Sequence, residues 1–203
     1  MTTITDAETL RALYGSPNPR SRDKVLSHLD PHCRRFIALS PFAVLSSTGP
    51  DGLGDVTPRG GAPGFVEIAD DRTLLLPDRP GNNRIDTLLN VVAHPGVGLL
   101  FLVPGVDETL RVQGTAAIDT DPALLSRFAV GERAPKTALR ITVREAYLHC
   151  AKALMRSRLW DPAARVERSV LPSMAEMMKD QLGLAAKAET QDEMIARYEA
   201  TLY

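Results

Sequence analysis

Hydrophobic and polar positions alternate with a period of two through the middle of the chain, which is typical of strands with one buried face. The clearest case is ALRITVREAYLH at 138–149. Turn-forming stretches separate these segments, for example GPDG at 49–52 and PGVDE at 104–108. The pattern predicts six or so short strands, distributed over seven candidate segments. They fall within the segments 42–48, 54–60, 64–68, 73–77, 97–103, 109–118 and 138–149.

Helical patterns lie on both sides of this region and interrupt it twice. Three short helices are expected at the start, ending near Leu39, because Asn18-Pro19 and Asp30-Pro31 each place a capping residue before a proline. Two helices are expected between strands, one over roughly 82–93 and one from Asp121 or Pro122 to about Val130. The remaining helical segments are 151–160, 172–184 and 189–203.

Strands that follow one another through tight turns, without regular alternation with helices, favour an antiparallel barrel over a doubly wound sheet. The predicted fold class is therefore α+β and mainly β, with flanking N- and C-terminal helices. We expect a helical lead-in over 1–40, a barrel over 41–162, and a C-terminal extension over 163–203. That extension is expected to pack on the barrel or on a partner.

Composition narrows the function classes. The chain has 203 residues and a formal net charge of −1, which gives no indication of a basic nucleic-acid or membrane binder. Its two cysteines, Cys33 and Cys150, form no disulfide framework, and no zinc motif is present, so no metal is expected. The N-terminus has no signal-peptide pattern, and the longest apolar run, 97–103, is too short to span a bilayer. We expect a cytoplasmic protein.

One stretch has the composition of an anion site. RPGNNRIDTLLN at 79–90 combines chain-breaking residues, two asparagines and an arginine with the start of a predicted helix. Asn82 or Asn83 would cap that helix, and Arg84 would lie in its first turn. Backbone N–H groups at a helix start bind anions, and a cation there opposes the helix dipole unless an anion is present. The alternative is a capped helix with Arg84 in water.

Two further stretches carry candidate anion ligands. Arg59 lies between Pro58 and a pair of glycines, where the backbone can approach a ligand closely. Lys152 and Arg156 are four residues apart and therefore share one helix face, where two like charges favour an anion between them. The alternatives are a turn with a solvated arginine and a solvated basic face.

Four motifs follow one another along the chain: DVTPRG, PDRPGNNR, HPGVGLLFLVPG and HCAKALMRSRLW. On these motifs, taken in order, the chain resembles the FMN-binding split-barrel family of pyridoxamine 5′-phosphate oxidase-like proteins. The similarity covers roughly residues 40–162 and is greatest to an FMN-dependent branch of that family. It implies a six-stranded antiparallel split β-barrel and a homodimer with two FMN molecules bound across the subunit interface.

The resemblance also implies which residues hold the cofactor. Thr57, Pro58 and Arg59 would lie along the flavin, and Pro77 and Asp78 would face the edge of its ring. Asn83 and Arg84 would hold the phosphate. The remaining ligands implied by the resemblance are Thr109 and Arg111 on a strand, and Lys152, Arg156, Ser157 and Trp160 from the partner subunit.

The chain departs from the oxidases that give the family its name. Those enzymes end in a strand with an arginine and a histidine that hold the substrate phosphate, whereas this chain ends in the helical pattern ETQDEMIARYEATLY. This difference argues against pyridoxamine phosphate as substrate. We expect an FMN-dependent oxidoreductase with a small-molecule substrate and no protein nucleophile. The alternatives are a non-catalytic flavin or haem binding module and an F420-dependent reductase.

Overall fold

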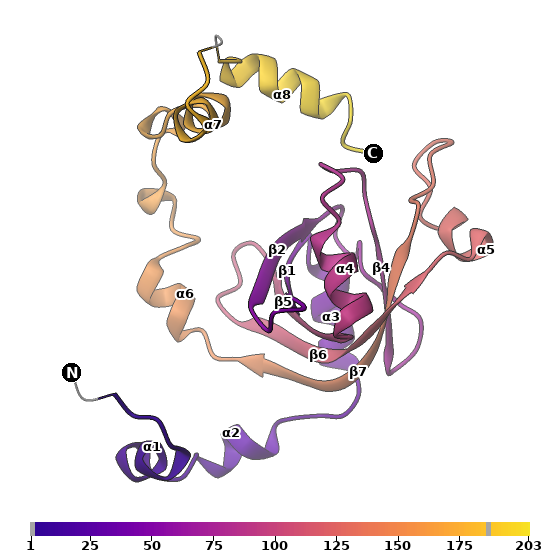
Figure 1. Ribbon diagram of the computed structural model, residues 1–203. Coiled ribbons are helices and arrows are strands. Elements are labelled where there is room, and N and C mark those ends of the chain that lie inside the picture. The colour runs from indigo at the N-terminus through magenta and orange to yellow at the C-terminus, as the bar shows by residue number, and fades with distance from the viewer. Residues whose placement is uncertain (1–2, 186–187) are drawn as a thin grey trace.

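The computed structural model describes residues 3–185 and 188–203, and its centre is one antiparallel sheet that curls into a split barrel (Figure 1). The strand order is β2-β1-β5-β6-β7-β4-β3. The strands are β1 Phe42–Thr48, β2 Gly54–Gly60, β3 Glu67–Ile68, β4 Thr73–Pro77, β5 Gly96–Leu102, β6 Thr109–Asp119 and β7 Ala138–His149. The predicted fold class is confirmed, and the sheet has seven strands where six were expected.

The predicted strand at 64–68 is wrong in extent, because only Glu67 and Ile68 pair, with β4. Gly64 has a φ of +79°, in the left-handed region that glycine tolerates. The amide of Phe65 donates to the carbonyl oxygen of Ala62 at 2.9 Å, so the chain turns here and does not extend.

Alternation along the strands builds the core, as predicted. On β7, Leu139, Ile141 and Val143 are buried, whereas Arg140 and Thr142 between them are exposed. Burial of such apolar side chains stabilises the fold by roughly 1.5–3 kcal/mol each.

Helix α3 (Pro31–Leu39) covers part of this core, next to β6 and β7. Its start is fixed by Asp30, whose side chain accepts a hydrogen bond from the amide of Cys33 at 2.7 Å, and by Pro31 in the first turn. Cys33 and Ile37 are its buried residues. Burial raises the pKa of the Cys33 thiol to about 12, so that thiol is an inert part of the core.

The other helices keep the predicted order. They are α1 Ala7–Tyr14, α2 Pro19–Asp23, α4 Asp86–Ala93, α5 Pro122–Ser126, α6 Lys152–Ser157, α7 Met174–Leu182 and α8 Gln191–Glu199. The three lead-in helices end at Leu39, as predicted. Helices α5 and α6 are shorter than expected. Turns follow Ser126, and Arg158 ends α6 by adopting a φ of +52°.

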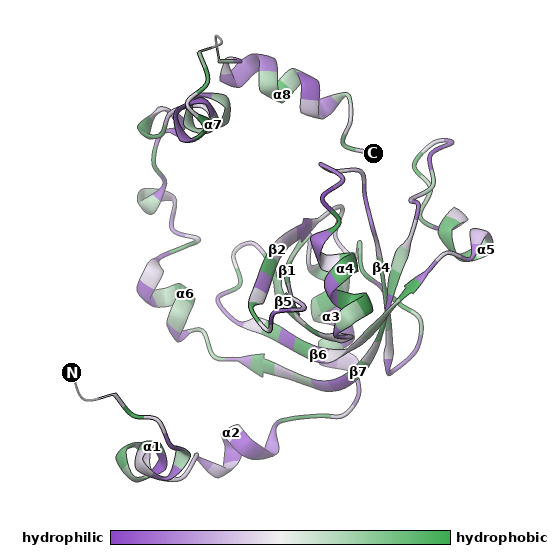
Figure 2. Ribbon diagram, in the orientation of Figure 1, coloured by the Kyte–Doolittle hydropathy of each residue, from purple (hydrophilic) through white to green (hydrophobic). Residues whose placement is uncertain are grey.

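The helices at the two ends of the chain lie apart from the barrel (Figures 1 and 2). In the described chain, α1, α2, α6, α7 and α8 contain no buried residue. The C-terminal arm, residues 152–203, leaves the end of β7 and returns toward the sheet at Tyr203 (Figure 1). No helix within residues 3–185 and 188–203 has the length and apolar character needed to cross a membrane.

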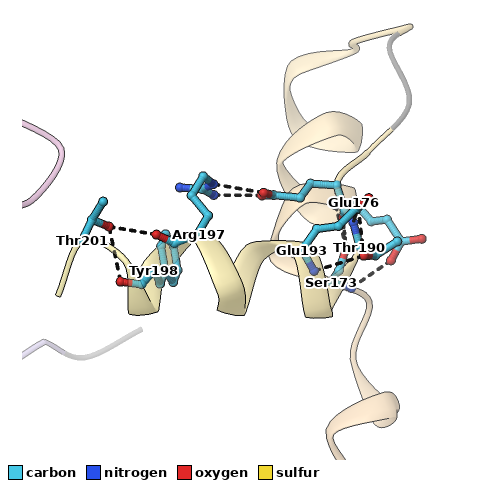
Figure 3. Close-up of polar contacts among 8 residues, drawn as sticks. Ser173, Glu176, Thr190, Glu193, Arg197, Tyr198 and Thr201 are labelled. Carbon is cyan, nitrogen blue, oxygen red and sulfur yellow. Dashed lines mark hydrogen bonds and ion pairs between the residues drawn. The ribbon is translucent and has the colours of Figure 1, made fainter.

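Side-chain hydrogen bonds fix the starts of the last two helices of the arm (Figure 3). Helices α7 and α8 each begin with a reciprocal capping box, Ser173 with Glu176 and Thr190 with Glu193. Arg197 on α8 holds Glu189 through two hydrogen bonds of 3.0 and 2.8 Å.

This arrangement exposes an unusually large surface. The chain exposes 13,765 Å². Surface-to-mass scaling predicts an exposed area of about 9,300 Å² for a compact monomer of 22.1 kDa. The exposed area of this chain is larger than that value by about 4,400 Å². The excess matches the separation of the terminal helices from the barrel.

Candidate functional site

A large cavity lies across the opening of the split barrel, between the side of the sheet that ends in β2 and the side that ends in β4 and β3. Its volume is about 1000 Å³. Three segments and Phe65 line it: the segments are 55–60 on β2, 76–88 from the end of β4 into α4, and 132–136 after α5. This volume is at the upper end of the range for sites of small ligands and cofactors, about 300–1,000 Å³.

An ion pair joins the two sides of the cavity. Arg59 on β2 donates from Nη1 to Oδ1 of Asp78 at 2.8 Å, and both side chains are mostly buried. The Nε–H of Arg59 is also buried, yet it has no hydrogen-bond partner among the described residues. A buried donor left without an acceptor costs about 1–3 kcal/mol. Arg59 is a residue of the cavity lining, and it therefore carries a buried donor that lacks an acceptor among the described residues.

The segment before α4 has an unusual backbone. Asn83 and Ile85 both adopt left-handed conformations, with φ of +58° and +53°. Asparagine tolerates this region, but for a β-branched residue such as Ile85 it is a strained conformation. The strained residue lies in the cavity wall.

The predicted capping of this helix is wrong. Helix α4 begins at Asp86, so neither Asn82 nor Asn83 caps it and Arg84 does not lie in its first turn. The Asn82 side chain instead accepts from the amide of Arg84 at 3.0 Å. This local bond competes with the helix for the backbone, and the left-handed turn at Ile85 delays the helix start.

The start of α4 consequently lacks a capping side chain. Ile85 occupies the N-cap position, and its apolar side chain offers no acceptor to the first amides of the helix. Residues 85–88 also line the cavity. Unpartnered amides and the positive end of the helix dipole therefore meet the cavity wall, an arrangement that favours an anion.

Arg84 is exposed at the same wall. It donates from Nε to Oδ2 of Asp86 at 2.8 Å, and this carboxylate raises the pKa of the guanidinium. With the Arg84 side chain 72% exposed, an incoming anion can reach it, although it must compete with Asp86.

The third wall, residues 132–136, was missed by the sequence analysis. The segment follows a tight turn in which Val130 and Arg133 exchange backbone hydrogen bonds, with Gly131 in the left-handed conformation. It is tied to the site because the amide of Asp78 donates to the carbonyl oxygen of Thr137 at 2.9 Å. Gly131 and Pro135 mark a turn, but nothing local indicates that this turn returns to β4.

The predicted site residues divide into two groups. The cavity brings together Thr57, Pro58, Arg59, Pro77, Asp78, Asn83 and Arg84. The other group, Thr109, Arg111, Lys152, Arg156 and Ser157, is absent from the described cavity lining, as is Trp160. Thr109 is buried opposite His149 in the β6–β7 ladder. Lys152, Arg156 and Ser157 are exposed on α6.

Arg111 belongs to a cationic cluster on β6 and β7. Its guanidinium lies 5.6 Å from the centre of the Tyr147 ring, and the Lys24 ammonium lies 5.2 Å from the same ring. Tyr147 also packs against His149, with ring centres 5.1 Å apart. Burial, followed by the charges of Lys24 and Arg111, lowers the pKa of His149.

The fold is that of a split-barrel protein with a cavity at the opening of the barrel. The sequence profile of the family described as pyridoxamine 5′-phosphate oxidase matches residues 29–150. The chain belongs to this family. Among curated proteins, none matches the sequence.

Several solved structures are similar to this one at low sequence identity. HupZ from Group A Streptococcus is 17% identical, with 58% of this chain and 90% of that chain covered and a TM-score of 0.48. General stress protein 26 from Bacillus anthracis is 16% identical, with 58% and 93% covered and a TM-score of 0.43. An FAD binding protein from Mycobacterium smegmatis is 16% identical, with 61% and 97% covered and a TM-score of 0.43.

Proposed function

We propose that this protein is an FMN-dependent oxidoreductase that acts on a small molecule in the cavity at the barrel opening. The observation that carries the proposal is that two elements of one cavity lining have unsatisfied hydrogen-bond donors. They are Arg59, with its buried Nε–H, and the uncapped start of α4 beside Arg84. The first calls for a neutral or partly charged acceptor, and the second calls for an anion. FMN carries both, because its ring has carbonyl oxygens and its ribityl chain ends in a phosphate.

The residues present fit this cofactor. Asn83, Arg84 and the first amides of α4 would hold the phosphate, whose charge Arg84 can meet with a forked pair of donors. Arg59 would donate to a ring acceptor, and Thr57 and Pro58 on the same strand would form the wall beside it. Bound FMN would supply the two-electron redox chemistry.

The chain's own residues would bind the cofactor, orient it and exclude water from it. Asp78 fixes the Arg59 guanidinium, so the cofactor would meet a donor already held in place. Phe65 and Leu76 give the cavity an apolar section that shields the reacting atoms from solvent.

One alternative cofactor is disfavoured by the lining. No histidine, cysteine or methionine is among the cavity residues that the structure describes, so haem iron would find none of these axial ligands here. An F420 cofactor would use the same anion site, and the experiment below separates it from FMN.

We also propose a homodimer. The surface excess of about 4,400 Å² is larger than one subunit's share of an obligate dimer interface, about 1,000–2,500 Å². Exposed apolar side chains on the C-terminal arm, such as Met155, Leu159 and Met178, would be covered by a second copy. Lys152, Arg156 and Ser157 would then serve the partner's cavity, since they do not line their own.

The test begins with the purified full chain. We expect a yellow protein, or a colourless one that takes up FMN in equilibrium titration, and bleaching of the bound flavin by NADPH or NADH under anaerobic conditions. Sedimentation should give twice the chain mass. A protein that takes up haem or F420 and ignores FMN would overturn the cofactor assignment. Flavin that binds but that neither donor reduces would favour a binding module.

A further inference from the structure

Residues 200–203, which we call the strap, bring the C-terminal arm back to the cavity. Arg133 donates from Nη1 to the main-chain oxygen of Tyr203 at 3.1 Å. The guanidinium carbon of Arg79 lies 5.2 Å from the centre of the Tyr203 ring. Both arginines line the cavity, although they come from segments more than fifty residues apart. Tyr203 therefore contacts two separate cavity walls at once.

These two arginines differ from the others in the cavity. Arg59 and Arg84 are ion-paired with Asp78 and Asp86. Within residues 3–185 and 188–203, Arg79 and Arg133 have no aspartate or glutamate partner at salt-bridge distance. Apart from one bond from Arg79 to the carbonyl oxygen of Phe128 at 2.7 Å, Tyr203 is the group that orients this pair.

Hydrogen bonds continue the last turn of α8 into the strap (Figure 3). The amide of Thr201 donates to the carbonyl oxygen of Tyr198 at 2.9 Å, and its hydroxyl donates to the carbonyl oxygen of Arg197 at 3.1 Å. These bonds fix the strap to the end of α8. Helix α8 is fixed in turn by the two bonds between Arg197 and Glu189.

We propose that the strap closes the rim of the cavity and that Tyr203 is a positioning residue, which holds Arg79 and Arg133 in place as one edge of the ligand site. Aromatic and main-chain contacts of this kind are weak enough to break and re-form without unfolding the barrel. Release of the strap would accompany ligand exchange, so it sets how fast a ligand leaves. Only the identity of the ligand used below rests on the proposed function.

The experiment compares three variants of the full chain. Tyr203→Ala removes the ring that covers Arg79, whereas Tyr203→Phe keeps it. Tyr198→Ala is the matched control, because Tyr198 also stacks on an arginine of the arm, Arg197 at 4.7 Å, but is not part of the strap. The first measurement is hydrogen–deuterium exchange of residues 131–136 in the ligand-free protein, and the second is the dissociation rate of FMN.

With Tyr203→Ala, we expect exchange at residues 131–136 to rise and FMN dissociation to accelerate on the order of threefold to tenfold. Tyr203→Phe and Tyr198→Ala should match the unmodified chain in both measurements. Unchanged exchange in Tyr203→Ala would overturn the docking of the strap. Faster exchange with an unchanged dissociation rate would overturn its closing role. If the unmodified chain fails to bind FMN, the proposed cofactor is wrong, and the exchange result alone decides whether the strap is docked.

Discussion

Arg59 Nη1 lies 2.8 Å from Asp78 Oδ1, and this contact joins two sides of a sheet that share no strand pairing in the described chain. Strand β2 is one edge of the sheet, and Asp78 directly follows β4 near the other edge. The ion pair therefore closes the barrel where backbone hydrogen bonds do not.

The first prediction concerns the strength of this closure. Because both side chains are mostly buried, Arg59→Ala should lower the free energy of unfolding by about 1–2 kcal/mol, since it leaves the Asp78 carboxylate without its partner. A double-mutant cycle with Asp78→Ala, followed by urea unfolding, measures the coupling. The pair Arg140 and Asp119, whose arginine side chain is 43% exposed, is the control, with an expected coupling of about 0.2–1 kcal/mol. Equal coupling in the two pairs would contradict a closing role for Arg59.

The second prediction concerns the proposed phosphate site. Arg84→Ala should weaken FMN binding by about 1–2 kcal/mol, a modest loss because the guanidinium is exposed in the ligand-free protein. Asp86→Asn should act in the opposite direction, since it removes the carboxylate that competes for Arg84 and a negative charge beside the phosphate. Isothermal titration with FMN and with riboflavin separates the phosphate from the ring.

The control for these variants is Arg144→Ala, an exposed arginine on β7 outside the cavity. It should leave both affinities unchanged. The difference between Arg84→Ala and the unmodified chain should vanish with riboflavin, which has no phosphate. An equal loss for both ligands would show that Arg84 does not hold the phosphate.

The third prediction concerns the irregularity in the β6–β7 ladder between Gln113 and Gly114. A Cβ added at Gly114 would collide with the main-chain carbonyl of Thr142, which belongs to β7 and cannot move without disturbing the ladder. We expect Gly114→Ala to lower the free energy of unfolding by about 3 kcal/mol or more. Gly96→Ala on β5, where a Cβ meets open space, should change it by less than about 0.5 kcal/mol. Similar unfolding midpoints for the two variants would show that β6 and β7 can move apart at Gly114 and make room for the added Cβ.

The fourth prediction concerns pH. The pKa of His149 is lowered by burial and then by Lys24 and Arg111, so the folded state favours the neutral ring. Its contribution to stability is therefore fully present above the ordinary histidine pKa of 6.5 and is lost as the pH falls through the lower folded value. NMR titration should show Lys24→Gln raising the pKa of His149. A pKa at or above 6.5 in the unmodified chain would contradict this account.

Much of the fold follows from local pattern. The twelve alternating residues of β7 and the Asp30-Pro31 start of α3 were predicted with the observed bounds or close to them. These features depend on neighbours in sequence: a period of two, a capping oxygen and a proline. The cluster of Arg59, Asp78 and Arg84 in one cavity was expected from the family resemblance, and the geometry brings these residues together.

The parts that could not be predicted depend on contacts distant in sequence. A left-handed Ile85 contradicts its own conformational preference, so no local rule places the start of α4 at Asp86. The wall at 132–136 reaches the cavity through a hydrogen bond between Asp78 and Thr137, nearly sixty residues apart. The roles predicted for Lys152, Arg156 and Ser157 require a second subunit and remain predictions.

The position of the cavity has a consequence for the amount of folded protein in a cell. A ligand seated across the barrel opening would contact both sides of the sheet, and any molecule that binds only the folded state stabilises that state in proportion to its concentration. Chains made faster than the proposed cofactor is supplied would keep the exposed segment 80–85 accessible, and such loops are preferred sites of proteolysis. The amount of this protein would then follow the supply of the proposed cofactor as well as the rate of its synthesis.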